Sequence, residues 1–266
     1  MELTLEEKFE KIKDLRPIDD VFFEVLAADP RVCEEILQTI LEDPGLAVES
    51  VIPQDTLPNL YSRSVRLDAL CVLGNGKRVN IEVQRSDSDD HLRRVRFNAA
   101  AVTVHGSHPG TDFRQIPDVI VVFITEFDFL RGGKTIYHVD KVLRETGTVI
   151  DDGQQEIYVN TVVDDGSRIA DLMSCFTKKQ VENRNFPVLS TTVQKYKTTE
   201  GGASAVCEVM QKYEEIARQE GISQGIFKNL IDNARTLMSA LGLSANAVLD
   251  LLKVEGDQRA AVLAAL

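Results

Sequence analysis

The sequence predicts an α/β protein, in which helices surround a sheet and a helical region follows it. In residues 65–84, apolar and polar side chains alternate on both sides of Gly74-Asn75-Gly76, which is typical of a β-hairpin. Residues 119–124 form a continuous apolar run, which is typical of a strand buried on both faces. Helical spacing of apolar residues before, between and after these segments predicts the surrounding helices.

The segments before the hairpin predict helices and one strand. Residues 5–15 are short and weakly amphipathic, which indicates a helix or an arm. Residues 21–26 and 32–41 predict two helices that each have an apolar face. Residues 48–52 predict a first strand, and Pro53 is expected to end it.

The loop of the hairpin decides which side chains share a face of the sheet. A two-residue turn at Asn75-Gly76 would put the two apolar rows on opposite faces, because a shift of one residue turns a strand over. A three-residue loop with Gly76 in the left-handed conformation pairs Leu73 with Lys77 and puts both rows on one face. Burial of a core therefore favours the three-residue loop.

The same register places Asp68 directly opposite Glu82 on the polar face. It also places Arg66 opposite Gln84. Opposed residues have Cβ atoms about 4.5–5.5 Å apart, so two carboxylates repel each other unless a positive charge lies near. A divalent metal ion would supply this charge, because hard cations take oxygen ligands. The alternative is an exposed face on which Arg66 and Arg78 neutralise the carboxylates.

A basic helix is expected after the hairpin, over residues 91–104. Arg93 and Arg96 lie three positions apart and share a face, with Arg94 on its flank. This face could bind phosphate groups, or it could be a solvated face paired with the acidic residues that precede the helix. The apolar stripe of the helix consists of Leu92, Val95, Ala99 and Val102.

The residues of the hairpin resemble a known nuclease site. Asp68, followed by Glu82-x-Gln84 on the next strand, resembles the D…(D/E)-x-K pattern of the PD-(D/E)XK nuclease superfamily. The local sequence around these residues is similar to that of the transposase-associated, recombination-promoting branch, in which Gln commonly replaces Lys. The resemblance covers roughly residues 16–221. Its matching stretches are D-D-V-F-F at 19–23, R-S-V-R-L-D at 63–68, N-I-E-V-Q-R at 80–85, R-R-V-R-F-N at 93–98, V-V-F-I-T-E at 121–126 and I-Y-V-N at 157–160.

The resemblance implies a restriction-endonuclease-like mixed-sheet core, in the order α-β-β-β-α-β, with helices on both faces. It also implies a metal-dependent DNA endonuclease linked to recombination or transposition, with Mg²⁺ or Mn²⁺ as cofactor. Asp68, Glu82 and the backbone carbonyl of Val83 would hold the ion, and Gln84 would position the attacking water. Asp20 could be a further ligand, although capping of the first core helix is its alternative role. The expected DNA contacts are Arg66, Arg85, Arg93, Arg94 and Arg96.

The composition limits the functions that the chain can have. The net charge of −12 over 266 residues argues against a protein that simply coats DNA. Residues 61–100 nevertheless carry a net charge of +3, which would permit a phosphate backbone at one cleft. The four cysteines are widely spaced, and Cys33 and Cys71 are expected to be buried free thiols in a reducing cytoplasm. No apolar run in the sheet region approaches the ~20 residues that span a bilayer, so no membrane partner is expected.

The expected organisation is an N-terminal arm (1–16), a nuclease-like domain (17–200) and a helical C-terminal region (201–266). The C-terminal helices could form a homodimer. The alternative function is a catalytically silent nuclease fold that acts as a binding or scaffold module, which the acidic net charge favours. A different hydrolase is disfavoured, because the sequence contains no P-loop or G-x-G-x-x-G motif and no Cys/His constellation.

Overall fold

The computed structural model describes residues 3–57, 65–88, 90–107, 109–110 and 112–266. The chain divides into two compact units, Met1–Val209 and Met210–Leu266. The division falls inside a long helix, α7 (Glu200–Leu241), whose first residues are the predicted start of the C-terminal region. Ala203 and Val206, in the first turns of α7, are fully buried, which explains why these turns belong to the first unit.

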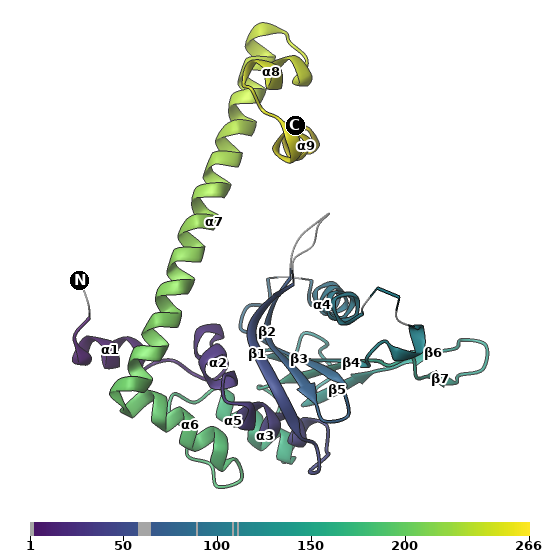
Figure 1. The fold of residues 1–266 in the computed structure, drawn as a ribbon, viewed down its shortest axis with the longest axis vertical. Helices are drawn as coiled ribbons and strands as arrows, with labels where there is room; N and C mark the ends of the chain where they lie inside the picture. The colour runs from purple at the N-terminus through teal and green to yellow at the C-terminus, as the bar shows by residue number, and fades with distance from the viewer. Residues whose placement is uncertain (1–2, 58–64, 89, 108, 111) are drawn as a thin grey trace. The chain divides into compact units, whose positions relative to one another are not determined.

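The first unit contains a mixed six-stranded sheet with the strand order β1-β2-β3-β4-β8-β5 (Figure 1). The strands β3, β4 and β8 are parallel to one another, and the other neighbouring pairs are antiparallel. This arrangement confirms the mixed sheet that the resemblance implies. The strands are β1 (Val48–Leu57), β2 (Val65–Leu73), β3 (Arg78–Gln84), β4 (Val119–Thr125), β5 (Ile136–Val139) and β8 (Gln154–Asn160); β6 (Lys141–Val142) and β7 (Val149–Ile150) form a separate pair.

The central strand β4 agrees with its predicted character, because all seven of its residues are buried. The prediction for β1 is wrong at its end, since the strand continues past Pro53 to Leu57. Pro53 still pairs with Ala69 of β2. A proline is tolerated there because β1 is at the edge of the sheet, where a missing N–H costs no ladder bond on the open side.

The hairpin between β2 and β3 has the predicted register. The N–H of Leu73 donates to the carbonyl of Lys77 at 2.9 Å, and Gly76 has a φ of +82°. Cys71 pairs with Val79, and these residues lie four positions before and four positions after Asn75, the centre of the loop. The three-residue loop is therefore confirmed, and Gly76 supplies the left-handed conformation that it requires.

Helices cover both faces of the sheet, so the alternative of an exposed polar face around Asp68 and Glu82 is wrong. Helix α4 packs against β3 and β4, and its Val95 and Ala99 join a core cluster with Leu70 and Val121. Leu92 is the exception in the predicted stripe, because 49% of its surface is exposed. The helices of this unit are α1 (Leu5–Ile12), α2 (Asp20–Ala27), α3 (Pro30–Ile40), α4 (His91–Gly106), the short 3₁₀ helix η1 (Phe113–Gln115), α5 (Arg168–Phe176) and α6 (Pro187–Thr198).

The second unit is helical and has its own small core. It contains the rest of α7 with α8 (Ala245–Leu251) and α9 (Gly256–Ala265). Its core is formed by five buried residues, namely Ala234, Val248, Leu249, Val254 and Val262. No helix among the described residues is long and apolar enough to cross a membrane. All four cysteines are buried free thiols, as predicted for Cys33 and Cys71.

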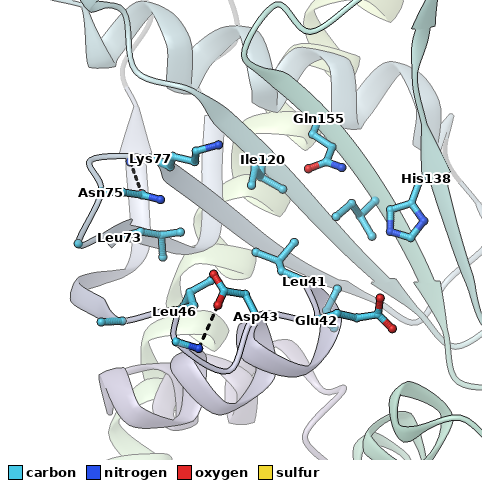
Figure 2. A pocket seen from close by; sticks show the side chains of 15 residues that line it. Leu41, Glu42, Asp43, Leu46, Leu73, Asn75, Lys77, Ile120, His138 and Gln155 are labelled. Atoms are coloured by element: carbon cyan, nitrogen blue, oxygen red, sulfur yellow. Dashed lines mark hydrogen bonds between the residues drawn. The ribbon is translucent and has the colours of Figure 1, made fainter. Parts of the chain in front are cut away.

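A cavity of about 380 Å³ lies beside the loop of the hairpin (Figure 2). Ile120, at the start of β4, and Ile157 form part of its wall, and Lys77 and His138 contribute polar groups. None of the predicted site residues lines this cavity, because they lie toward the opposite ends of β3 and β4. The candidate site is therefore a different part of the sheet.

Candidate metal centre at a fork between two strands

The candidate site lies where β2 and β3 separate. The pairing between these strands extends from Val72 and Arg78 to Ala69 and Ile81. Beyond this point β2 continues beside β1, while β3 continues beside β4. Asp68 and Glu82 are the next residues on the two strands, so both lie at the base of the fork.

The two carboxylates occupy the place of the missing ladder bonds. The N–H of Val83 donates to Asp68 Oδ2 at 2.9 Å, and the N–H of Asp68 donates to Glu82 Oε1 at 3.3 Å. The same Oε1 accepts a hydrogen bond from Asn80 Nδ2 at 2.9 Å. The structure thus brings Asp68 and Glu82 together as the register predicts, and it adds Asn80, which sequence reasoning missed. Asn80 could have been predicted as part of the site, because it is a polar residue two positions before Glu82 and therefore lies on the same face of the strand.

Both carboxylates are buried. Asp68 is 8% exposed and Glu82 is fully buried. Burial raises the pKa of Asp68 well above its ordinary value, the charge of Glu82 raises it further, and the Val83 hydrogen bond opposes the shift. Burial also raises the pKa of Glu82, against the effects of the Arg94 charge and the Asn80 hydrogen bond. Two buried carboxylates, of which one raises the pKa of the other by its charge, favour either a bound proton or a cation beside them.

The backbone of Val83 faces the same fork. The N–H and C=O of one strand residue point to one side, and those of the next residue point to the other side. The carbonyl of Gln84 accepts a hydrogen bond from the N–H of Glu126 on the β4 side, at 3.0 Å. The N–H and C=O of Val83 therefore point toward β2, where the N–H already contacts Asp68. The Val83 carbonyl is thus directed as its predicted role requires.

Gln84 and Arg94 form one hydrogen-bonded unit beside the carboxylates. Arg94 Nη1 donates to Gln84 Oε1 at 2.6 Å, and Arg94 Nη2 donates to Glu82 Oε2 at 3.3 Å. Gln84 Nε2 donates to the carbonyl of Ser86 at 3.0 Å, which fixes the orientation of the amide. Each end of an amide can make a second hydrogen bond, so Gln84 keeps the capacity to orient a water molecule.

Asp20 lies within electrostatic reach of the fork, at the start of α2. The pKa of its carboxyl is raised, mainly because the surrounding protein removes part of its hydration, and the charge of Arg94 opposes this shift. The charge of Asp20 in turn raises the pKa of Asp68. The alternative capping role does not apply, because the N-cap residue of α2 is Asp19, and no side chain caps this helix.

The five arginines predicted to contact DNA differ in their exposure and in their partners. Arg94 points at the carboxylates, as described above. Arg66 and Arg96 are exposed, and Arg93 is exposed and paired with Asp90 at 3.3 Å. Arg85 is half-exposed and holds two acidic partners of its own.

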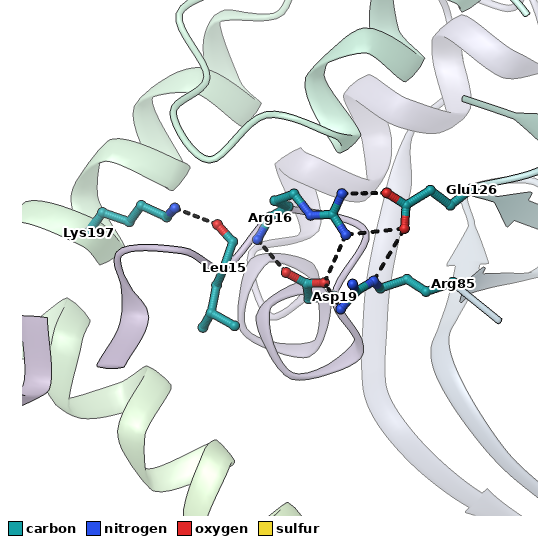
Figure 3. Close-up of polar contacts among 6 residues, drawn as sticks. All are labelled: Leu15, Arg16, Asp19, Arg85, Glu126 and Lys197. Atoms are coloured by element: carbon teal, nitrogen blue, oxygen red, sulfur yellow. Dashed lines mark hydrogen bonds and ion pairs between the residues drawn. The ribbon is translucent and has the colours of Figure 1, made fainter. Parts of the chain in front are cut away.

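Those partners belong to a four-residue ion network beside the fork (Figure 3). Arg85 contacts Asp19 at 2.7 Å and Glu126 at 3.3 Å. Arg16 binds the same two acids, and the backbone N–H of Arg16 donates to Asp19 at 2.6 Å. The network joins the segment before α2 to the ends of β3 and β4. Arg16 was not predicted as part of the site, since it lies 110 positions from Glu126 in the sequence.

Lys197 of α6 attaches the N-terminal arm to the same unit. Its Nζ donates to the carbonyl of Leu15, and to those of Lys13 and Lys179 (Figure 3 shows the first of these bonds). Burial lowers the pKa of Lys197 to about 8. The predicted arm is therefore packed on the domain that contains the fork.

The oxygen atoms at the fork fit a divalent cation of the Mg²⁺ type. No three His, Cys, Asp or Glu side chains in the described part of the chain lie close enough together to hold a metal by themselves. Mg²⁺, however, is usually bound by one or two carboxylates and completes its shell with water and substrate phosphates. The hydrogen bond from Val83 reaches the Asp68 carboxylate at Oδ2, and the hydrogen bond from Arg94 reaches Glu82 at Oε2. Two carboxylate oxygens and the Val83 carbonyl are therefore suitable ligands.

Comparison with protein families decides the family of this unit. Residues 33–162, close to half of the chain, match the sequence model of the PD-(D/E)XK nuclease family transposases. This segment belongs to the PD-(D/E)XK nuclease family. The nuclease-family segment runs from α3 through β8 and contains Asp68, Glu82, Gln84 and Arg94, whereas Asp20 lies outside it. No curated protein and no solved structure matches the chain.

Proposed function

We propose that the protein is a metal-dependent DNA endonuclease that acts in recombination or transposition. The observation that carries this proposal is the fork, at which two buried carboxylates and a backbone carbonyl converge in a nuclease-family segment. The proposed ligands are Asp68, Glu82 and the Val83 carbonyl, with Mg²⁺ or Mn²⁺ as the ion. Asp20 is the proposed further ligand, because its charge acts on the Asp68 carboxyl.

Different residues of the site would have different roles in phosphodiester hydrolysis. When bound, the ion lowers the pKa of a water molecule and screens the charge that develops on the phosphate. Gln84 orients the attacking water through the free hydrogen-bonding capacity of its amide. Gln84 is uncharged, so the positive charge beside the reacting groups comes from Arg94. Arg66, Arg93 and Arg96 are exposed and would contact the DNA backbone, which positions a duplex without reading its sequence.

Nicking of a supercoiled plasmid tests this function. We expect the wild type to nick DNA only with Mg²⁺ or Mn²⁺, and we expect Asp68→Ala and Glu82→Ala to lose this activity. Asp140→Ala is the matched control, because it removes an exposed carboxylate with no ion pair among the described residues. Nicking that persists in either site variant would contradict the assigned ligands.

A silent nuclease fold that binds partners is the competing function, and the net charge of −12 is the observation that favours it. The two functions differ in metal binding. An intact centre raises the melting temperature with Mn²⁺, because the ion binds the folded state alone. A wild-type protein with neither nicking nor this temperature shift would favour the binding function.

A further inference from the structure

Arg94 has a position that DNA contact alone does not explain. Its guanidinium is about one-third exposed, and it bridges the Gln84 amide and the fully buried Glu82 carboxylate. Its charge also lowers the pKa values of Asp20, Asp68 and Glu82. Arg94 is thus the shared counter-charge of the acidic cluster at the fork.

The hydrogen bonds of Glu82 place Arg94 in competition with a metal ion. Glu82 Oε1 already accepts from Asn80 and from the N–H of Asp68, which uses both of its lone pairs. Glu82 Oε2, the oxygen that remains for a cation, accepts from Arg94 Nη2. A dication on this oxygen would face the positive guanidinium at short range, and like charges at such a distance repel strongly in a buried site.

We infer that Arg94 is a metal-released latch: a divalent cation at Asp68 and Glu82 displaces the guanidinium from Glu82, and the freed guanidinium then binds the DNA phosphate. This inference rests on the proposed function and adds a regulation of the same site. A guanidinium suits the second role, because it recognises phosphate oxygens with two parallel hydrogen bonds. Its partial exposure allows it to turn toward a ligand that arrives from solvent. Metal loading and phosphate binding are thereby coupled through one side chain.

The latch predicts that loss of Arg94 changes metal affinity and nicking in opposite directions. Arg94→Gln should bind Mn²⁺ at least fivefold more tightly than the wild type in calorimetric titration of the full-length protein. The same variant should nick plasmid DNA at least tenfold more slowly with saturating Mn²⁺. Arg94→Lys keeps the positive charge but lacks the planar guanidinium. Its Mn²⁺ affinity and its nicking rate should both lie between those of the wild type and Arg94→Gln. Arg96→Gln is the control on the same helix, because Arg96 is exposed, and its Mn²⁺ affinity should stay within twofold of the wild type.

The outcomes separate the latch from the proposed function. If the wild type binds Mn²⁺ and nicks DNA while Arg94→Gln binds Mn²⁺ equally or more weakly, the nuclease stands and the latch is wrong. Unchanged nicking by Arg94→Gln at saturating Mn²⁺ would also overturn the latch. If the wild type does not bind Mn²⁺, both the proposed function and the latch are overturned. Tighter Mn²⁺ binding together with slower nicking supports the latch, because a side chain that only supports the fold would lower both.

Discussion

At the scale of single residues, the fork holds a charge arrangement that works against folding. Asp68 and Glu82 are buried in contact, and burial raises the pKa of each. Arg94 and the backbone N–H groups offset this only in part. Sites that concentrate like charges commonly lower stability in exchange for function. The residues at the fork are therefore expected to limit the stability of the protein when no cation is bound.

Asp68→Asn should consequently stabilise the protein in the presence of EDTA. Because the pKa of Asp68 is higher in the folded than in the unfolded state, the folded state binds more protons between the two values. The free energy of unfolding of the wild type therefore falls as the pH rises through this interval. Asp68→Asn has no carboxyl at this position, so its free energy of unfolding does not fall for this reason. We expect a melting temperature a few degrees above the wild type at pH 7.5, since about 1 kcal/mol corresponds to 2–4 °C at this size.

Thermal unfolding between pH 4 and 8 checks this expectation. The advantage of Asp68→Asn should shrink toward pH 4, where the wild-type carboxyl is protonated in the folded state and begins to take up a proton in the unfolded state. Asp140→Asn, at an exposed carboxylate, should match the wild type at every pH. A variant that melts at or below the wild-type temperature at pH 7.5 would show that the carboxylates do not repel each other.

At the scale of elements, the hairpin loop sets the register that brings the carboxylates together. Gly76 adopts a φ of +82°, and a Cβ atom placed there would meet no other atom within 4 Å. A substitution at this position is therefore disfavoured by the backbone conformation and by nothing else. The loop sets the pairing of Leu73 with Lys77, and the same register places Asp68 and Glu82 next to each other where the ladder ends.

Gly76→Ala should lower the free energy of unfolding by about 1 kcal/mol, which is the cost of a left-handed conformation for an L-residue. Gly201→Ala is the control in the same unit, because Gly201 is helical with open space around it. It should leave stability unchanged or raise it by less than about 1 kcal/mol. Urea unfolding at pH 7 measures both. Equal effects of the two substitutions would mean that the loop conformation is not strained by a side chain.

At the scale of the whole molecule, the proposed chemistry and the proposed self-association belong to different units. All the fork residues lie in Met1–Val209, together with the arm that Lys197 holds. The second unit has its own small core and contributes none of them. The homodimer through the C-terminal helices stays a prediction.

A fragment of residues 1–209 should therefore fold and keep its stabilisation by Mn²⁺. It should also be monomeric, whereas the full chain should have the mass of a dimer. Thermal unfolding with and without Mn²⁺ tests the first expectation, and light scattering after size exclusion tests the second. An unfolded fragment would show that the units depend on each other, and equal oligomeric states would place any dimer contact in the first unit.

The sequence alone determined the sheet hairpin, its register and the proximity of Asp68 and Glu82, because alternation and loop length are local properties. It also determined the buried strand β4 from the continuous apolar run of residues 119–124. It did not determine that the two strands of the hairpin separate at Asp68 and Glu82. It did not determine that both faces of the hairpin are buried, since α4 supplies the cover from a segment that follows the hairpin. The continuation of β1 past Pro53 likewise depended on its edge position.

The tertiary structure decided how the charges are distributed around the fork. Sequence spacing grouped Arg94 with Arg93 and Arg96, whereas the path of α4 turns Arg94 toward Glu82 and leaves the others exposed. The network of Arg16, Asp19 and Glu126 depends on segments more than 100 positions apart. Local sequence patterns determine which side chains share a face of a strand or turn. The partner of a charged side chain is determined only when distant elements pack, because electrostatic pairing depends on distance in space.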